Sequence, residues 1–164
     1  MGTEIERKFL IDAKRFLTEM RGNPPMGLHS TLLTQGYLSF EPAVRVRVKY
    51  GEAELTVKGK GLLVRPEFNF RIAVQEGDEL LRMCKGAIIE KDRYKAGAAW
   101  PWEVDEFHGA LKGLWLAEIE LTHPDAPFDR PVWLGQEVTE DERFSNANLA
   151  QNGIAGLEEF LQDV

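Results

Sequence analysis

Alternation of apolar and polar residues dominates the chain and predicts β-strands. Successive side chains of a strand point to opposite faces, so a period of two marks a strand with two unlike sides. In Val44-Arg45-Val46-Arg47-Val48, valines occupy one face and arginines the other. The pattern predicts strands over residues 4–11, 30–40, 43–49, 53–58, 65–74, 87–95, 102–107 and 113–122.

Three helical segments accompany these strands. Asp12 is a suitable N-cap for a helix over residues 13–20, because its carboxylate can accept hydrogen bonds from free backbone N–H groups. Further helices are expected over 76–84 and over 146–162, the latter broken at Gly153. Loops are expected at 23–25 and 124–131, where prolines gather. The fold class is therefore α+β and mainly β, as one antiparallel sheet or barrel with helices packed on it.

Composition indicates a folded domain with its own core. The chain has 164 residues, 43% apolar and 29% charged, so we expect one domain over residues 1–164. Cys84 is the single cysteine, which excludes an internal disulfide and favours a reducing compartment. Charges from Glu4 onward are unlike a signal peptide, and no apolar run is long enough to span a membrane. These features predict a cytoplasmic protein with no membrane partner.

Charge and histidine content exclude two further classes of site. The net charge is −7, which argues against a nucleic-acid partner bound through bulk positive charge. The scattered His29, His108 and His123 offer no zinc spacing. A small anion held in a local basic pocket remains compatible with this balance.

Charged side chains recur on one face of nearly every predicted strand. For a single strand, a sheet with one face in water is the ordinary explanation. Here, however, that face carries almost only acidic and basic residues, without the usual mixture of Ser, Thr and Gln. If the sheet closes, these side chains line a wet tunnel and the apolar face lies outside. They are Glu4, Glu6, Lys8, Arg45, Arg47, Lys58, Arg65, Glu67, Asn69, Arg71, Lys91, Arg93, Glu103, Asp105, Glu118 and Glu120.

An interior lined with both signs of charge fits a polyphosphate bound with a divalent cation. Buried charge without a partner is destabilising, so such a lining needs ligands. Arginine and lysine donate charge-assisted hydrogen bonds to phosphate oxygens, and carboxylates bind hard cations such as Mg²⁺. The cation neutralises charge on the transferring phosphoryl group. Neither set of residues alone would both bind the phosphate and place the metal.

An ordered set of short motifs extends across almost the whole chain. Its first member, Glu4-Ile5-Glu6-Arg7-Lys8, has the form E-x-E-x-K, which is weak alone because any charged strand can show it. Taken in order, the set resembles the CYTH family, also called triphosphate tunnel metalloenzymes, and is most similar to short bacterial inorganic triphosphatases. The further members are Gln35–Leu38, Arg45–Arg47, Thr56–Lys58, Arg65–Glu67, Glu90–Tyr94, Glu118–Glu120 and Val138–Phe144.

The resemblance implies an eight-stranded antiparallel β-barrel with helices packed outside and a tunnel that binds triphosphates with Mg²⁺ or Mn²⁺. It implies that Glu4 and Glu6 ligate the metal together with Glu118 and Glu120 from the opposite wall. Glu67 is implied as a further ligand or as the carboxylate that orients the attacking water.

The resemblance also implies a clamp of basic side chains for the phosphates. Lys91 and Tyr37 are expected near the scissile phosphate, although packing at the barrel mouth explains Tyr37 equally well. Arg65 and Arg71 share the charged face near its ends and are expected at the rim. The implied clamp consists of Lys8, Arg45, Arg47, Lys58, Lys91 and Arg93.

Three polar residues have open roles. Asn69 stands where many members carry a second glutamate, so it keeps a carbonyl ligand but adds no charge. Asp105 is expected either to ligate the metal or to orient Arg93 or Lys91, and Glu103 is equally open.

The expected reaction is hydrolysis of inorganic tripolyphosphate to pyrophosphate and orthophosphate. Thiamine triphosphate and nucleoside triphosphates are alternative substrates that need a surface for the base or thiazole. A class IV-type adenylyl cyclase and a non-catalytic polyphosphate-binding module are further alternatives. Members of the family often form dimers, so a homodimer is an open expectation. The candidate aromatic residues for a base are equally consistent with packing on the outer face: Trp100, Trp102, Trp115 and Trp133.

Overall fold

The computed structural model describes residues 2–22, 29–99 and 101–164. The loop expected at 23–25 and Trp100 lie outside these residues. Every strand expected from the sequence forms, with each end within two residues of its predicted position. A short ninth strand, which alternation did not predict, is added. The strands are β1 (Gly2–Ile11), β2 (Ser30–Phe40), β3 (Ala43–Lys49), β4 (Glu52–Lys58), β5 (Val64–Ile72), β6 (Lys85–Ala96), β7 (Trp102–Phe107), β8 (Trp115–Glu120) and β9 (Leu134–Glu137).

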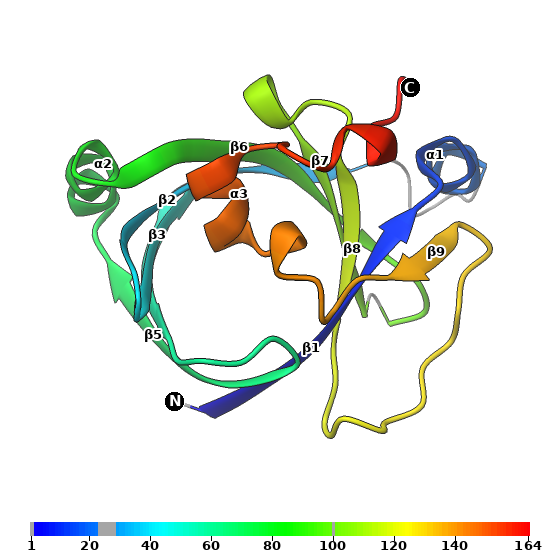
Figure 1. Ribbon diagram of the computed structural model, residues 1–164, viewed down its shortest axis with the longest axis horizontal. Helices are drawn as coiled ribbons and strands as arrows, with labels where there is room; N and C mark the ends of the chain where they lie inside the picture. Colours follow the sequence, from blue (N-terminus) through cyan, green and yellow to red (C-terminus); the bar gives the residue numbers. More distant parts are fainter. Residues whose placement is uncertain (1, 23–28, 100) are drawn as a thin grey trace.

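Eight of these strands close into an antiparallel barrel (Figure 1). The order around the ring is β5-β4-β3-β2-β6-β7-β8-β1, and β1 returns to β5 through pairs from Gly2–Glu67 to Ile5–Val64. The expected closed, mainly β fold is thereby confirmed. β9 pairs with the far end of β1, where the Arg7 guanidinium also binds the Glu137 carboxylate outside the barrel.

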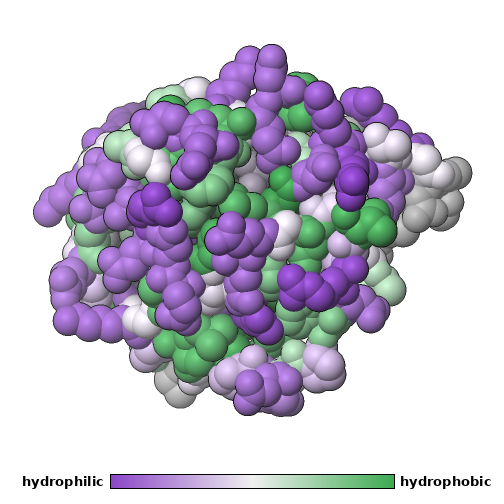
Figure 2. Space-filling view, turned by 45° about the vertical axis from the view of Figure 1, so that its right-hand side comes forward, coloured by the Kyte–Doolittle hydropathy of each residue, from purple (hydrophilic) through white to green (hydrophobic). Residues whose placement is uncertain are grey.

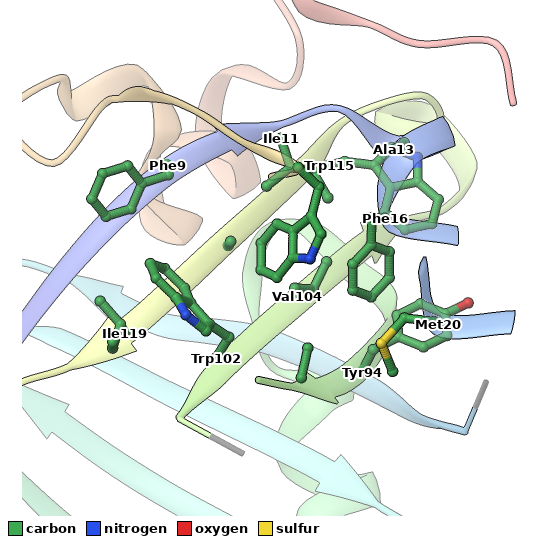
Figure 3. Packing of buried hydrophobic residues seen from close by; sticks show 13 residues of the cluster. Phe9, Ile11, Ala13, Phe16, Met20, Tyr94, Trp102, Val104, Trp115 and Ile119 are labelled. Atoms are coloured by element: carbon green, nitrogen blue, oxygen red, sulfur yellow. The ribbon is translucent and has the colours of Figure 1, made fainter. Parts of the chain in front are cut away.

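Helix α1 (Ala13–Arg21) covers the outer face of β1 and its neighbours. The Asp12 carboxylate caps it as expected, accepting a hydrogen bond from the Arg15 backbone at 3.0 Å. Phe16 then packs in a cluster of aromatic side chains, which also contains the fully buried Trp102 (Figure 3). Trp115 and Trp133 belong to the same cluster, so all three described tryptophans pack outside the barrel and leave its interior free for polar groups.

Helix α2 (Val74–Arg82) lies against the outer face of β3 and β4, two residues earlier in the chain than predicted. Gly77 permits this approach, because a Cβ there would lie 2.7 Å from the Ala53 Cβ and 2.9 Å from the Val48 Cγ2. The outer face of β5 stays partly open: Phe68 and Phe70 are 37% and 53% exposed.

Helix α3 (Asn146–Asn152) ends at Gly153, which adopts a positive φ of 61°. The expected continuation to residue 162 is instead a set of turns with a short 3₁₀ segment, η3 (Glu158–Phe160). Whereas α1 and α2 lie outside, α3 and the preceding turn η2 (Glu142–Phe144) lie within the outline of the ring in Figure 1. Leu149 packs there in a buried cluster with side chains that project inward from the strands. The C-terminal segment therefore fills one end of the barrel.

The outer surface is largely polar. Charged and polar side chains cover most of the face shown in Figure 2, with smaller apolar patches between them. Among the described residues, no helix is long and apolar enough to cross a membrane.

Candidate functional site

The barrel encloses two cavities that meet at shared lining residues. The larger has a volume of about 940 Å³ and is bounded at one side by the C-terminal segment. The smaller has a volume of about 350 Å³ and is lined by the β3–β4 turn. Side chains of the charged face predicted from the sequence line much of the larger cavity and part of the smaller one. Their shared lining residues are Arg47, Glu54, Arg93 and Glu103.

Carboxylates from β1 and β8 form one acidic wall of the larger cavity, because these strands are neighbours. The expectation that Glu118 and Glu120 lie on the wall opposite Glu4 and Glu6 is therefore wrong. Glu6 and Glu120 are paired directly across the two strands, an arrangement that is destabilising for like charges unless a cation lies nearby. Burial and the Glu118 carboxylate raise the pKa of Glu6 to about 7. Burial and Glu4 also raise the pKa of Glu120. Within the part of the chain described, Glu6 forms no ion pair, and the charges of Lys8 and Lys58 only partly offset the rise in its pKa.

Two other predicted metal ligands are held by basic side chains. Glu4 accepts from the Lys58 Nζ at 3.0 Å and from the Arg65 Nε at 2.7 Å. Arg65, which was expected at the rim, thus contacts Glu4 and lines the larger cavity. Glu118 accepts from the Lys8 Nζ at 3.1 Å and from Arg93 at 3.0 Å. These contacts bring predicted metal ligands and predicted phosphate ligands together in one network.

Arginines on β3 form the opposite wall, since β3 and β8 lie four strands apart in either direction around the ring. Arg47 donates to the Gln35 Oε1 at 3.0 Å, and burial, with Arg45 and Arg93 nearby, lowers its pKa to about 9. Arg45 contacts the Thr56 hydroxyl at 3.0 Å. Its buried Nε has no hydrogen-bond partner among the described residues. Arg45 also lies 3.6 Å from the Glu54 carboxylate, whereas Arg47 forms no ion pair within the described residues. The unused Arg45 Nε and the unpaired Arg47 charge are what an anion site requires.

Asp105 holds two of the predicted clamp residues together. It accepts from the Lys91 Nζ at 2.6 Å and from the Arg93 Nε and a terminal nitrogen at 2.7 Å each. Lys91 is fully buried, and this burial lowers its pKa to about 8 although Asp105 opposes the shift. Glu103 contacts both Arg93 and Lys95. Of the two roles open for Asp105, this geometry fits the orientation of basic side chains.

Tyr37 and Lys91 are not adjacent. Tyr37 is paired across the strands with Arg45, whereas Lys91 is paired with Leu33, four residues away along β2. The Tyr37 ring stacks on Phe40 with 5.6 Å between centroids, and burial raises the pKa of its hydroxyl. Tyr37 nevertheless lines the larger cavity beside Arg45.

Glu67 and Asn69 lie on β5, next to Lys58 of β4. Burial works against ionisation of Glu67, but Lys58 at 3.0 Å and the Asn69 amide at 2.7 Å lower its pKa to about 2. The Asn69 carbonyl accepts from the Thr56 hydroxyl at 2.7 Å. Asn69 therefore supports Glu67, and its own oxygen is engaged by the protein.

Neutral polar residues complete the network and were not predicted as site residues. Gln35 and Thr56 are fully buried and contact Arg47 and Arg45. Both belong to motifs noted in the sequence, which was the available signal. Asn146 contacts Lys91 from α3, and no strand pattern could place it in the barrel.

The donor set fits a divalent cation, although no three acidic, histidine or cysteine side chains of the described residues already converge as metal ligands. The reason is visible in the contacts: Glu4 and Glu118 are turned toward basic groups. Glu6, by contrast, is a carboxylate of the cavity lining near two other carboxylates, and it forms no ion pair with the described residues. Oxygen ligands of this kind suit Mg²⁺ or Mn²⁺.

Comparison with known proteins agrees with this architecture. The family model described as the CYTH domain matches residues 2–154. The chain belongs to the CYTH family. An inorganic triphosphatase of Acetivibrio thermocellus is similar to this CYTH protein, with 40% identity over 164 residues, covering 97% of this chain and 100% of the relative.

Two further similarities cover almost the whole CYTH chain. An inorganic triphosphatase of Nitrosomonas europaea is 37% identical over 155 residues, covering 90% of this chain and 97% of the relative. A crystal structure of an inorganic triphosphatase has a TM-score of 0.60 at 35% identity, covering 92% of this chain and 95% of that chain.

Proposed function

We propose that this CYTH protein is a triphosphate hydrolase dependent on Mg²⁺ or Mn²⁺, and that it converts inorganic tripolyphosphate to pyrophosphate and orthophosphate. One observation carries the proposal: Arg47 faces an acidic wall on which Glu6 lies, and neither forms an ion pair among the described residues. A triphosphate with its cation supplies a partner for each. The two relatives named inorganic triphosphatase support the choice of substrate.

The basic side chains are proposed to bind and orient the phosphates. Arg45 and Arg47 supply donors directed at the larger cavity, and Arg93 lines both cavities. Charge-assisted hydrogen bonds of this kind stabilise the charge that spreads over the phosphoryl oxygens during transfer. Lys8 and Lys58 join this clamp when their carboxylate partners take the cation.

The carboxylates Glu4, Glu6, Glu118 and Glu120 are proposed to hold the cation, with Glu67 as a further ligand or as the group that orients water. When bound, the cation supplies charge neutralisation at the phosphates. With a pKa of about 2, Glu67 is ionised at neutral pH, so its carboxylate can accept a hydrogen bond from the attacking water.

Two residues are proposed near the scissile phosphate. Asp105 holds Lys91 beside Arg93, so the Lys91 charge is proposed to act on the phosphate group that Arg93 binds. Tyr37 lines the cavity beside Arg45, so its hydroxyl is proposed as a donor to a phosphate oxygen. A homodimer and a cytoplasmic location stay predictions.

Release of orthophosphate and pyrophosphate tests the proposal. Purified protein is incubated with tripolyphosphate, ATP or thiamine triphosphate, with Mg²⁺, with Mn²⁺ and with chelator. We expect orthophosphate release that needs the metal and is fastest on tripolyphosphate. Glu118→Gln should lower the rate of orthophosphate release by about 100-fold or more. Glu118 is a proposed metal ligand and also contacts the clamp residues Lys8 and Arg93.

The matched control is Glu140→Gln, an exposed glutamate outside the barrel lining, which should keep wild-type rates. Pyrophosphate release from ATP would indicate a cyclase instead. Tripolyphosphate binding without any turnover would leave a binding module as the better account.

A further inference from the structure

We propose that Asn146, on the C-terminal segment, is a further substrate-binding residue: its amide oxygen positions Lys91 while its amide nitrogen donates to a phosphate oxygen. The inference rests on the proposed function, since it assigns a new contact for the same triphosphate. It gives the segment that fills one end of the barrel a direct part in recognising the substrate.

The orientation of the Asn146 amide follows from its neighbours. The Lys91 ammonium only donates hydrogen bonds, so the Asn146 atom 3.0 Å from it is the oxygen. The same oxygen accepts from the Gln35 Nε2 at 3.3 Å. Gln35 is itself oriented by Arg47, another group that only donates, which lies 3.0 Å from the Gln35 Oε1. Lys91 and Arg47, which only donate, therefore fix which atom of the Asn146 and Gln35 amides is the oxygen and which is the nitrogen.

This orientation leaves the Asn146 Nδ2 for a ligand. Asn146 lines the larger cavity, together with Arg45 and Arg47. Its Nδ2 donates no hydrogen bond to any residue in the ranges 2–22, 29–99 and 101–164. An amide nitrogen carries two N–H donors and no charge, so it contacts a phosphate oxygen without disturbing the balance of the two charged walls. A phosphate oxygen bound there also lies close to the Lys91 charge.

The backbone that carries Asn146 is held in place by packing. Leu149 is fully buried and Ala150 nearly so, both inside the barrel end. The Lys8 Nζ donates to the Phe144 carbonyl at 3.2 Å, and the Ser145 hydroxyl caps α3 by accepting from Asn148. Asn146 is thus presented to the cavity before substrate arrives, which reduces the entropy lost on binding.

Asn146→Asp separates the two roles of the amide. The variant keeps an oxygen acceptor for Lys91 but replaces both N–H donors with a negative oxygen. Tripolyphosphate binding to the full chain is measured by titration calorimetry in chelator, and kcat and KM are measured with Mg²⁺. We expect the Kd and KM to rise about 10- to 100-fold, from loss of a hydrogen bond to a charged group. Asn152→Asp, the same change at an exposed position of α3, should match wild type.

Asn146→Ala removes the donor without adding charge and should weaken binding about tenfold. If Asn146→Asp weakens binding but Asn146→Ala does not, repulsion explains the effect and the donor role is wrong. Wild-type affinity in both variants would show that Asn146 only packs. Failure of the wild-type protein to bind or hydrolyse tripolyphosphate in the presence of Mg²⁺ would instead overturn the proposed function, so the two failures are distinguishable.

Discussion

Replacing Glu6 with glutamine should stabilise the metal-free protein while removing its activity. Glu6 lies in the lining of the larger cavity, near Glu118 and Glu4, and is paired across the strands with Glu120. Glutamine keeps the shape of the side chain and removes the charge. A metal-binding site without its cation should contain a residue that destabilises the fold but is needed for activity.

The magnitude follows from the pKa. Burial and Glu118 raise the pKa of Glu6 from its ordinary value of 4.5 to about 7, which corresponds to about 3 kcal/mol at pH values above both. The folded state binds the Glu6 proton more tightly than the unfolded state does, so ionisation of Glu6 lowers the free energy of unfolding. Stability of the metal-free wild-type protein therefore falls as pH rises from about 4.5 to about 7 on account of this group. This pKa already includes the attraction of Lys8, so we expect a net gain of about 1–3 kcal/mol for Glu6→Gln at pH 8.

Urea unfolding in chelator at pH 8 and at pH 4 measures the effect. The gain at pH 8 corresponds to a rise of about 2–10 °C in Tm. It should almost vanish at pH 4, where Glu6 is protonated in the folded state and mostly protonated in the unfolded state. Glu140→Gln, at an exposed position, is the control and should change neither value. Addition of Mn²⁺ should stabilise wild type more than Glu6→Gln. A loss of stability in Glu6→Gln at pH 8, or a gain that does not depend on pH, would refute the reasoning.

Two further changes test the β5 wall and the C-terminal segment. Asn69→Glu adds a carboxylate beside Glu67 and should tighten Mn²⁺ binding about tenfold in calorimetric titration, because each added ligand charge favours a hard cation; an unchanged or weaker Kd would show that the Thr56–Asn69–Glu67 contacts matter more. Leu149→Ala truncates a fully buried side chain inside the barrel end and should lower the free energy of unfolding by about 2–5 kcal/mol in urea; a loss below about 1 kcal/mol would mean that the segment contributes little to the core.

Much of the candidate site could be predicted from alternation alone. Glu4, Glu6 and Lys8 face inward because residues two apart on a strand share a side, and this holds whatever the strand pairs with. The same rule placed Arg7 outside, where it binds Glu137. Asp12 correctly predicted the start of α1, because the capping hydrogen bond from the Arg15 backbone joins residues only three apart.

Partners across the barrel could not be predicted in this way. Arg65 was expected at the rim, yet closure of β1 on β5 sets it opposite Glu4. Asp105 had two open roles until the β6–β7 register placed it against Arg93 and Lys91. Register depends on turns and on packing between distant segments, which no single strand encodes.

The sequence by itself determined which side chains line the interior and that both signs of charge meet there, because side-chain direction is a property of each strand. Only the tertiary structure decided that the sheet closes, that β9 joins β1, and that α3 enters the barrel with Asn146 instead of covering its outside. These features depend on contacts between residues far apart in the chain, such as Lys91 and Asn146. An amphipathic helix buries its apolar face equally well on either side of a sheet, so local pattern cannot choose between them.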